Sequence, residues 1–270
     1  MGMNTPQKIC ILFFAVAVVG LWLVLYFTNT QSGPYNYLYS FLFGLIPFFS
    51  GIAAMIYAEM WGGLKSAVGK ALFFIGLGIF CWGCGENIWS YYNVVLNVPA
   101  PYPSLADLGF APSIFFYGLG AIYLSKATGA QFALRNKTAR AFAMLAPFVI
   151  LGISYYILVT IARGGVLVSD GGNILKTLLD IAYPLGDFVG LTVAIVVSSL
   201  SFKYLGGRYV WDIYAILLGL LVMFVGDTIF SYTTTVGTYY NADFGDLVLA
   251  TGVFLLSFGV LGFYDIKNAD

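Results

Sequence analysis

The 270-residue chain contains no histidine. This absence excludes haem held by an axial histidine, histidine-based zinc or copper sites, and Ser-His-Asp or Cys-His catalysis. Cysteine is nearly as scarce, and Cys10, Cys81 and Cys84 all lie within apolar runs, so we expect no disulfide framework of the secreted kind. Because no nucleophile–base pair is visible, we expect a protein that is not an enzyme and has no cofactor.

Charge is also sparse. Charged residues make up 9% of the chain and hydrophobic residues 60%. A soluble domain has roughly 25% charged residues, so too few polar groups remain here to cover a globule in water. The twelve basic and twelve acidic residues balance, and the net charge gives no indication of nucleic-acid binding. Most of the surface must therefore face lipid, and the bilayer is the first expected partner.

Long apolar runs are abundant, and a helical membrane span takes about 20 mostly apolar residues. Eight runs qualify: 9–27, 38–59, 70–92, 107–125, 140–162, 174–201, 209–232 and 244–265. The first run is too long for a signal peptide and has no small-x-small cleavage site, so it is also assigned as a span. The sequence predicts an all-α fold, a polytopic transmembrane helical bundle of about eight spans, in one integral membrane domain over residues 1–270.

The basic residues are distributed unequally between the two sides of these spans. Ten lie on the side of both termini: Lys8, Lys65, Lys70, Lys126, Arg135, Lys137, Arg140, Lys203, Arg208 and Lys267. Only Arg163 and Lys176 lie on the other side. Because short cytoplasmic loops are enriched in Lys and Arg, we expect a multi-pass protein of the cell membrane with both termini in the cytoplasm.

An internal repeat relates the two halves of the chain. Residues 85–91 align with residues 226–232, so Glu86 and Asp227 occupy equivalent positions in the two halves. About twenty residues further on, Asp107 and Asp246 occupy matching positions, each followed by leucine. We predict two parallel four-helix repeats, about 9–125 and 140–265, related by a pseudo-twofold axis along the membrane normal.

Carboxylates gather near the predicted outer ends of the spans. They are Glu86, Asp107, Asp180, Asp187, Asp227 and Asp246. A charge in the hydrocarbon costs roughly 2.5–3.5 kcal/mol on insertion scales, so such residues usually face the bundle interior or a wet cavity. We predict an outward-facing acidic cavity for Ca²⁺ or another hard cation, or for a small organic amine. The rings of Trp89 and Tyr183 are expected to support an organic cation.

Structural roles are the alternative for every one of these carboxylates. Asp107, Asp180 and Asp246 open predicted helices, where a carboxylate can cap free N–H groups. Glu86, Asp187 and Asp227 can instead hydrogen-bond across helices to serine, asparagine or tyrosine side chains and hold the bundle together. The sequence leaves both interpretations open.

Several short motifs together resemble a known family. They are 103–107, 183–187, Gly226-Asp227, 237–239 and Asp246. They are similar to the multi-span sensor region found ahead of diguanylate cyclase (GGDEF) domains in bacteria, over roughly residues 70–265. The resemblance implies an input module that senses an extracytoplasmic or membrane cue. No cyclase or kinase domain follows the last predicted span here, so we expect signalling output to need a membrane or cytoplasmic protein partner.

Three functions follow from these patterns. The leading hypothesis is a standalone, sensor-like, ligand-binding membrane protein whose site is the acidic cavity. A transporter or channel for a cation or small molecule is the first alternative, although the inner halves of the spans offer few polar residues to line a path. A structural subunit of a membrane complex is the second.

Overall fold

The computed structural model describes residues 6–129, 137–161, 164–166, 178–179, 183, 192 and 209–266. The long helices are α1 (Pro6–Phe27), α2 (Pro34–Met60), α3 (Ala67–Val94), α4 (Asp107–Ala127), α5 (Lys137–Tyr155), α7 (Val210–Val236) and α8 (Phe244–Leu261). Shorter helical turns are η1 (Gly63–Lys65), the π-helical η3 (Tyr156–Ile161) and η4 (Gly262–Ile266). These described residues form no strand, which confirms the all-α prediction for this part of the chain.

Among the described residues, six helices are long and apolar enough to cross a membrane: α1, α2, α3, α4, α7 and α8. The chain is a multi-pass membrane protein, and six of the predicted spans are confirmed to within a few residues. The run at 140–162 forms most of α5 and η3, which are not among the six. Most of the run at 174–201 lies outside the described residues.

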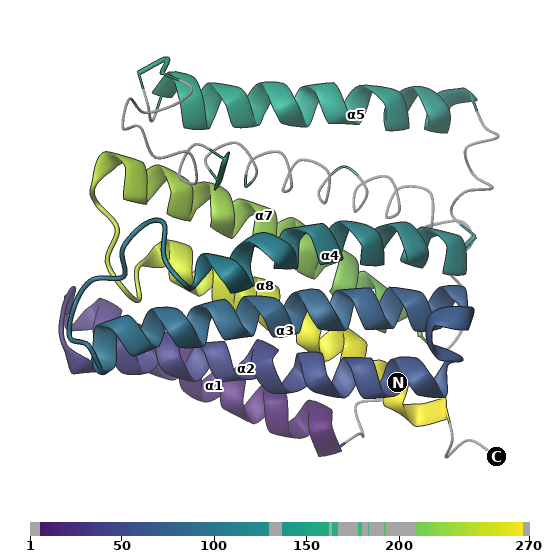
Figure 1. The fold of residues 1–270 in the computed structure, drawn as a ribbon, viewed down its shortest axis with the longest axis horizontal. Coiled ribbons are helices and arrows are strands. Elements are labelled where there is room, and N and C mark those ends of the chain that lie inside the picture. Colours follow the sequence, from purple (N-terminus) through teal and green to yellow (C-terminus); the bar gives the residue numbers. More distant parts are fainter. Residues whose placement is uncertain are drawn as a thin grey trace.

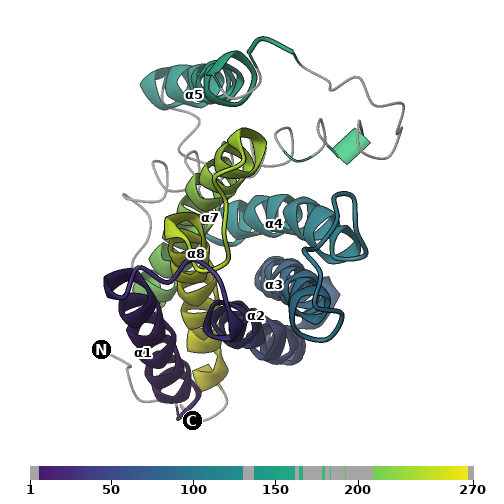
Figure 2. The same cartoon turned by 90° about the vertical axis from the view of Figure 1, so that its left-hand side faces the viewer.

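The six apolar helices pack side by side, with α5 at the edge of the molecule beyond α4 and α7 (Figures 1 and 2). α8 is the central element, because it packs against α7, α2, α1 and α3. The other extensive interfaces join α2 to α3 and α3 to α4. The start of α1 and the end of α8 lie at the same end of the bundle (Figure 1).

Local sequence signals set the helix ends. Pro34 occupies the first turn of α2, where its missing N–H costs nothing. The Ser66 hydroxyl accepts the Gly69 N–H at 2.8 Å and caps α3. Gly237 ends α7 with a φ of 76°, a left-handed conformation that suits glycine. Asp243 caps α8, since its Oδ1 accepts the Asp246 N–H at 3.0 Å.

Glycines allow close approach between neighbouring helices. A Cβ added at Gly51 of α2 would lie 2.5 Å from the Phe80 backbone nitrogen of α3. A Cβ added at Gly109 of α4 would lie 2.4 Å from the Gly85 nitrogen. Backbones can approach this closely only where no side chain intervenes, which is the usual role of small residues in membrane helices.

Three pairs of glycines aligned by the sequence repeat make equivalent contacts. In the first pair, Gly78 faces Tyr117 and Gly219 faces Leu256. In the second, Gly85 faces Phe110 and Gly226 faces Leu249. In the third, Gly120 faces Ile75 and Gly259 faces Ile216. The helix pairs α3–α4 and α7–α8 therefore pack in the same way. The larger arrangement of two four-span halves stays a prediction, because most of residues 174–201 lie outside the described part of the chain.

Polar contacts tie the first helices to the last. The Lys8 ammonium, on a residue only 5% exposed, pairs with Asp212 Oδ1 of α7 at 2.5 Å. The Trp22 indole N–H donates to the Asp243 carbonyl at 3.0 Å. The Ser50 and Ser257 hydroxyls share a 2.6 Å hydrogen bond between α2 and α8. These contacts tie α1 and α2 to α7 and α8, and the Trp22 bond holds the start of α8, the part that lines the cavity.

Candidate ligand-binding cavity

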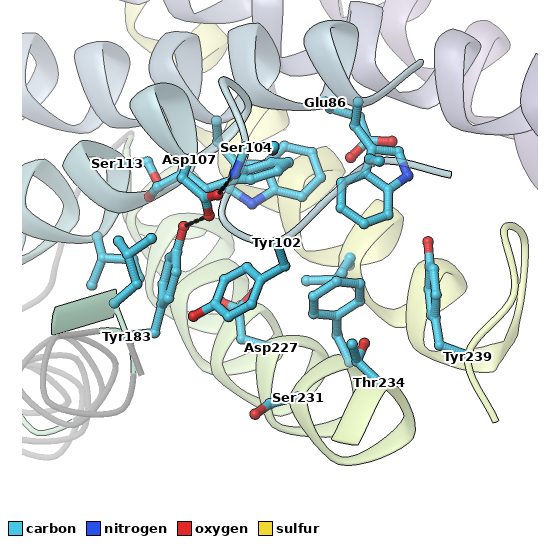
Figure 3. A pocket seen from close by; sticks show the side chains of 18 of the residues that line it. Glu86, Tyr102, Ser104, Asp107, Ser113, Tyr183, Asp227, Ser231, Thr234 and Tyr239 are labelled. Carbon is cyan, nitrogen blue, oxygen red and sulfur yellow. Dashed lines mark hydrogen bonds between the residues drawn. The ribbon is translucent and has the colours of Figure 1, made fainter. Parts of the chain in front are cut away.

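A cavity of about 540 Å³ lies among α3, α4, α7 and α8, toward the end of the bundle opposite the termini (Figure 3). Its wall includes eight aromatic residues: Trp82, Trp89, Tyr102, Phe110, Tyr117, Tyr183, Phe230 and Tyr239. It also includes four acidic residues, Glu86, Asp107, Asp227 and Asp246, and no lysine or arginine among its described lining. The cavity is therefore acidic and largely aromatic.

Six of the eight residues predicted as a site line this one cavity. They are Glu86, Trp89, Asp107, Tyr183, Asp227 and Asp246. The other two, Asp180 and Asp187, lie outside the described residues. The structure thus brings carboxylates from four helices into one space, as their predicted positions near the outer ends of the spans indicated. Their role in holding a ligand stays a prediction.

Asp107 is the first residue of α4 and has partners for both carboxylate oxygens. The Ser104 N–H donates to Oδ2 at 2.7 Å, and the Tyr183 hydroxyl donates to Oδ1 at 2.5 Å (Figure 3). These bonds fix the loop that enters α4, and they take up the strongest acceptor positions of the carboxylate. Asp107 thus has a structural role, but not the helix cap predicted as its alternative, because its bonded N–H belongs to Ser104, before the helix, and α4 has no side-chain cap.

Asp246 is likewise held by the protein. The Ala242 N–H donates to its Oδ2 at 2.7 Å, and the Tyr239 hydroxyl lies 3.4 Å from the same oxygen. The prediction that Asp246 caps the helix is wrong, because Asp243, three residues earlier, is the cap. A carboxylate at the third helical position reaches back across the helix start instead, as in a capping box.

Glu86 and Asp227 differ from these two aspartates. Within the described part of the chain, no group donates a hydrogen bond to either carboxylate, although Glu86 is only 7% exposed. The proposed locking partners are absent: Asn87 donates to the Gly44 and Gly83 carbonyls, and the Ser90 hydroxyl has no partner. The alternative in which Glu86 locks helices by these contacts is therefore wrong.

Tyr117 of α4 is a lining residue that sequence reasoning missed. It is 6% exposed, and its hydroxyl has no hydrogen-bond partner. An unsatisfied buried hydroxyl costs about 1–3 kcal/mol, and each such group calls for an explanation.

The loop between α7 and α8 covers one side of the cavity. The Tyr239 ring packs edge-on against Phe230, with centroids 4.9 Å apart, and against Trp89 at 6.1 Å. Asn241 Oδ1 accepts hydrogen bonds from Ser40, Trp89, Asn93 and Tyr239. Burial raises the pKa of the Tyr239 hydroxyl well above its ordinary value, and nearby carboxylates, Asp246 first, add to this. Tyr239 is therefore a neutral donor.

Metal-binding geometry is absent from the described residues. No three acidic or cysteine side chains among them come close enough to hold one ion. Ca²⁺ takes six to eight oxygen ligands, which this part of the wall does not bring together.

The chain matches no protein-family model, no curated protein and no solved structure. Its helices and cavity define its class: a multi-pass membrane protein with an acidic, aromatic-walled cavity.

Proposed function

We propose that this protein binds a small organic cation in the cavity and acts as a sensor-like membrane protein. The observation that carries the proposal is a pair of carboxylates, Glu86 and Asp227, that accept no hydrogen bond from the described residues, in a wall with no described lysine or arginine. A carboxylate in a low-dielectric site is costly unless it is paired or protonated. A bound ammonium group compensates it, and aromatic ring faces add to the attraction.

Sensing rather than catalysis fits the remaining features. The short motifs around Asp107, Asp227 and Asp246 resemble bacterial sensor regions, which supports an input role. The bias of ten basic residues against two supports cytoplasmic termini and a cavity that opens outward. The equivalent glycine contacts of α3–α4 and α7–α8 support two repeat halves with the ligand between them.

The test is a thermal-unfolding screen of the full chain in mild detergent against n-alkylamines, Ca²⁺ and Mg²⁺. A ligand at 100 times its Kd stabilises the folded state by about 2.7 kcal/mol. We expect an amine to raise the melting temperature of the wild type, and the rise to shrink in Glu86→Gln and in Asp227→Asn. Glu59→Gln is the matched control, because Glu59 is an exposed carboxylate of α2 outside the cavity lining.

Two results would count against the proposal: no stabilisation by any cation, or the same stabilisation in wild type and both cavity variants. Amine uptake into proteoliposomes that requires the protein would instead indicate transport.

A further inference from the structure

The cavity offers two available carboxylates rather than four. Asp107 and Asp246 each accept a backbone N–H at 2.7 Å and lie beside a tyrosine hydroxyl. Glu86 and Asp227 have no such partner among the described residues. They are also the two residues that the sequence repeat aligns with each other. The free acidic groups are thus one from each repeat, at equivalent positions.

These two carboxylates belong to helices that are not packed together. α3 packs against α2, α4 and α8, whereas α7 packs mainly against α8. In Figure 3 Glu86 comes from the α3 side of the cavity and Asp227 from the α7 side, with the cavity between them. An extended molecule lying in the cavity can reach both groups.

Much of the remaining cavity wall suits hydrocarbon. It includes Trp82, Phe110, Tyr117, Phe230 and Leu249. Methylene groups are stabilised when they are buried against such surfaces, and ammonium groups are attracted to the ring faces. A volume of about 540 Å³ is within the usual range for small-molecule sites.

Glu86 supplies a further indication of an occupant. It lines the cavity and is only 7% exposed, and no described residue donates a hydrogen bond to its carboxylate. A buried carboxylate is costly unless a positive charge or a donor compensates it.

We infer that the ligand is an organic dication of the α,ω-diamine type, with one ammonium group at Glu86, the other at Asp227, and its methylene chain along the aromatic wall. The inference rests on the proposed function, that the cavity binds an organic cation. Two positive ends balance two negative groups, whereas a monoamine leaves one carboxylate uncompensated in a low-dielectric site.

Isothermal titration of the full chain in detergent compares α,ω-diaminoalkanes with n-alkylamines of equal carbon number. We expect the wild type to prefer the diamine by roughly tenfold or more, as is typical of one additional buried charge pair. This preference should fall close to unity in Glu86→Gln and in Asp227→Asn, and it should persist in Glu59→Gln.

Charge-preserving variants keep the test decisive if a neutral variant fails to fold. Glu86→Asp withdraws one carboxylate by one methylene, so the preferred diamine should become about one carbon longer. Asp227→Glu advances the other carboxylate, and the preferred diamine should become shorter.

Each outcome separates this inference from the proposed function. Equal affinity for diamines and monoamines, with both weakened in the cavity variants, overturns the dication and leaves organic-cation binding intact. An unchanged length preference in Glu86→Asp and Asp227→Glu also overturns it. Failure of every amine to bind overturns both proposals.

Discussion

Substitution of Gly51 by alanine tests the close contact between α2 and α3. The added Cβ would lie 2.5 Å from the Phe80 nitrogen and 2.7 Å from the Gly76 carbonyl oxygen. Carbon contacts are comfortable at about 3.5 Å or more, so the helices must separate by roughly 1 Å. Both opposing atoms belong to the backbone and cannot rotate away.

The magnitude follows from two opposing effects. Overpacking a tight interface costs about 1–3 kcal/mol, and alanine recovers up to about 1 kcal/mol through its better helix propensity. Because backbone atoms provide the clash, we expect a net loss of about 2 kcal/mol. For a chain of this size, that loss lowers the melting temperature by roughly 4–8 °C.

Tryptophan fluorescence during heating of the detergent-solubilised protein measures this shift. Gly20→Ala on α1 and Gly152→Ala on α5 are matched controls, because a Cβ at either position meets no atom within 4 Å. Both should melt at or above the wild-type temperature. The packing argument fails if Gly51→Ala melts with the wild type, or if the controls fall by the same amount.

Three further predictions use other contacts. Gly44→Ala places a Cβ 2.8 Å from the Glu86 Cγ. Because the Glu86 side chain can move, calorimetry should show several-fold weaker amine binding with little change in melting temperature. Unchanged amine binding would contradict this prediction. Lys8→Met breaks the buried ion pair with Asp212 and should lower the free energy of unfolding by about 3 kcal/mol. Adding Asp212→Asn should restore part of that stability in the same melting assay. No recovery would indicate that loss of the ion pair does not cause the destabilisation. Asp243→Ala removes the α8 cap and should cost about 1 kcal/mol, whereas Asp243→Asn keeps an acceptor oxygen and should cost less; equal losses would argue against capping.

The helices of this protein were largely predictable, because an apolar run in lipid must satisfy its backbone internally and so forms a helix. The positions of the helix ends were less predictable. The run at 70–92 becomes Ala67–Val94 because Ser66, outside the apolar run, provides the cap. The assignment of the α8 cap to Asp246 failed for a similar reason: a second aspartate, Asp243, lies at the position where the chain enters the helix.

The cavity was predictable in its depth and acidity but not in its available groups. Asp107 and Asp227 are the same residue type at similar predicted depth, yet only Asp107 is met by the Ser104 N–H and the Tyr183 hydroxyl. Those donors come from irregular backbone and from a residue 76 positions away, which no local pattern reveals. Tyr117 is one of 20 tyrosines, and only the missing partner of its hydroxyl distinguishes it.

Lys8 was assigned from the sequence to the basic residues flanking the spans, whereas the structure buries it against Asp212, 204 positions later. At synthesis rates of roughly 5–20 residues per second, Asp212 follows Lys8 from the ribosome after about 10–40 s. During that interval α1 is made but its ammonium group has no carboxylate from α7 to pair with. The ion pair that joins α1 to α7 can therefore form only after α7 has been made, long after α1 has left the ribosome.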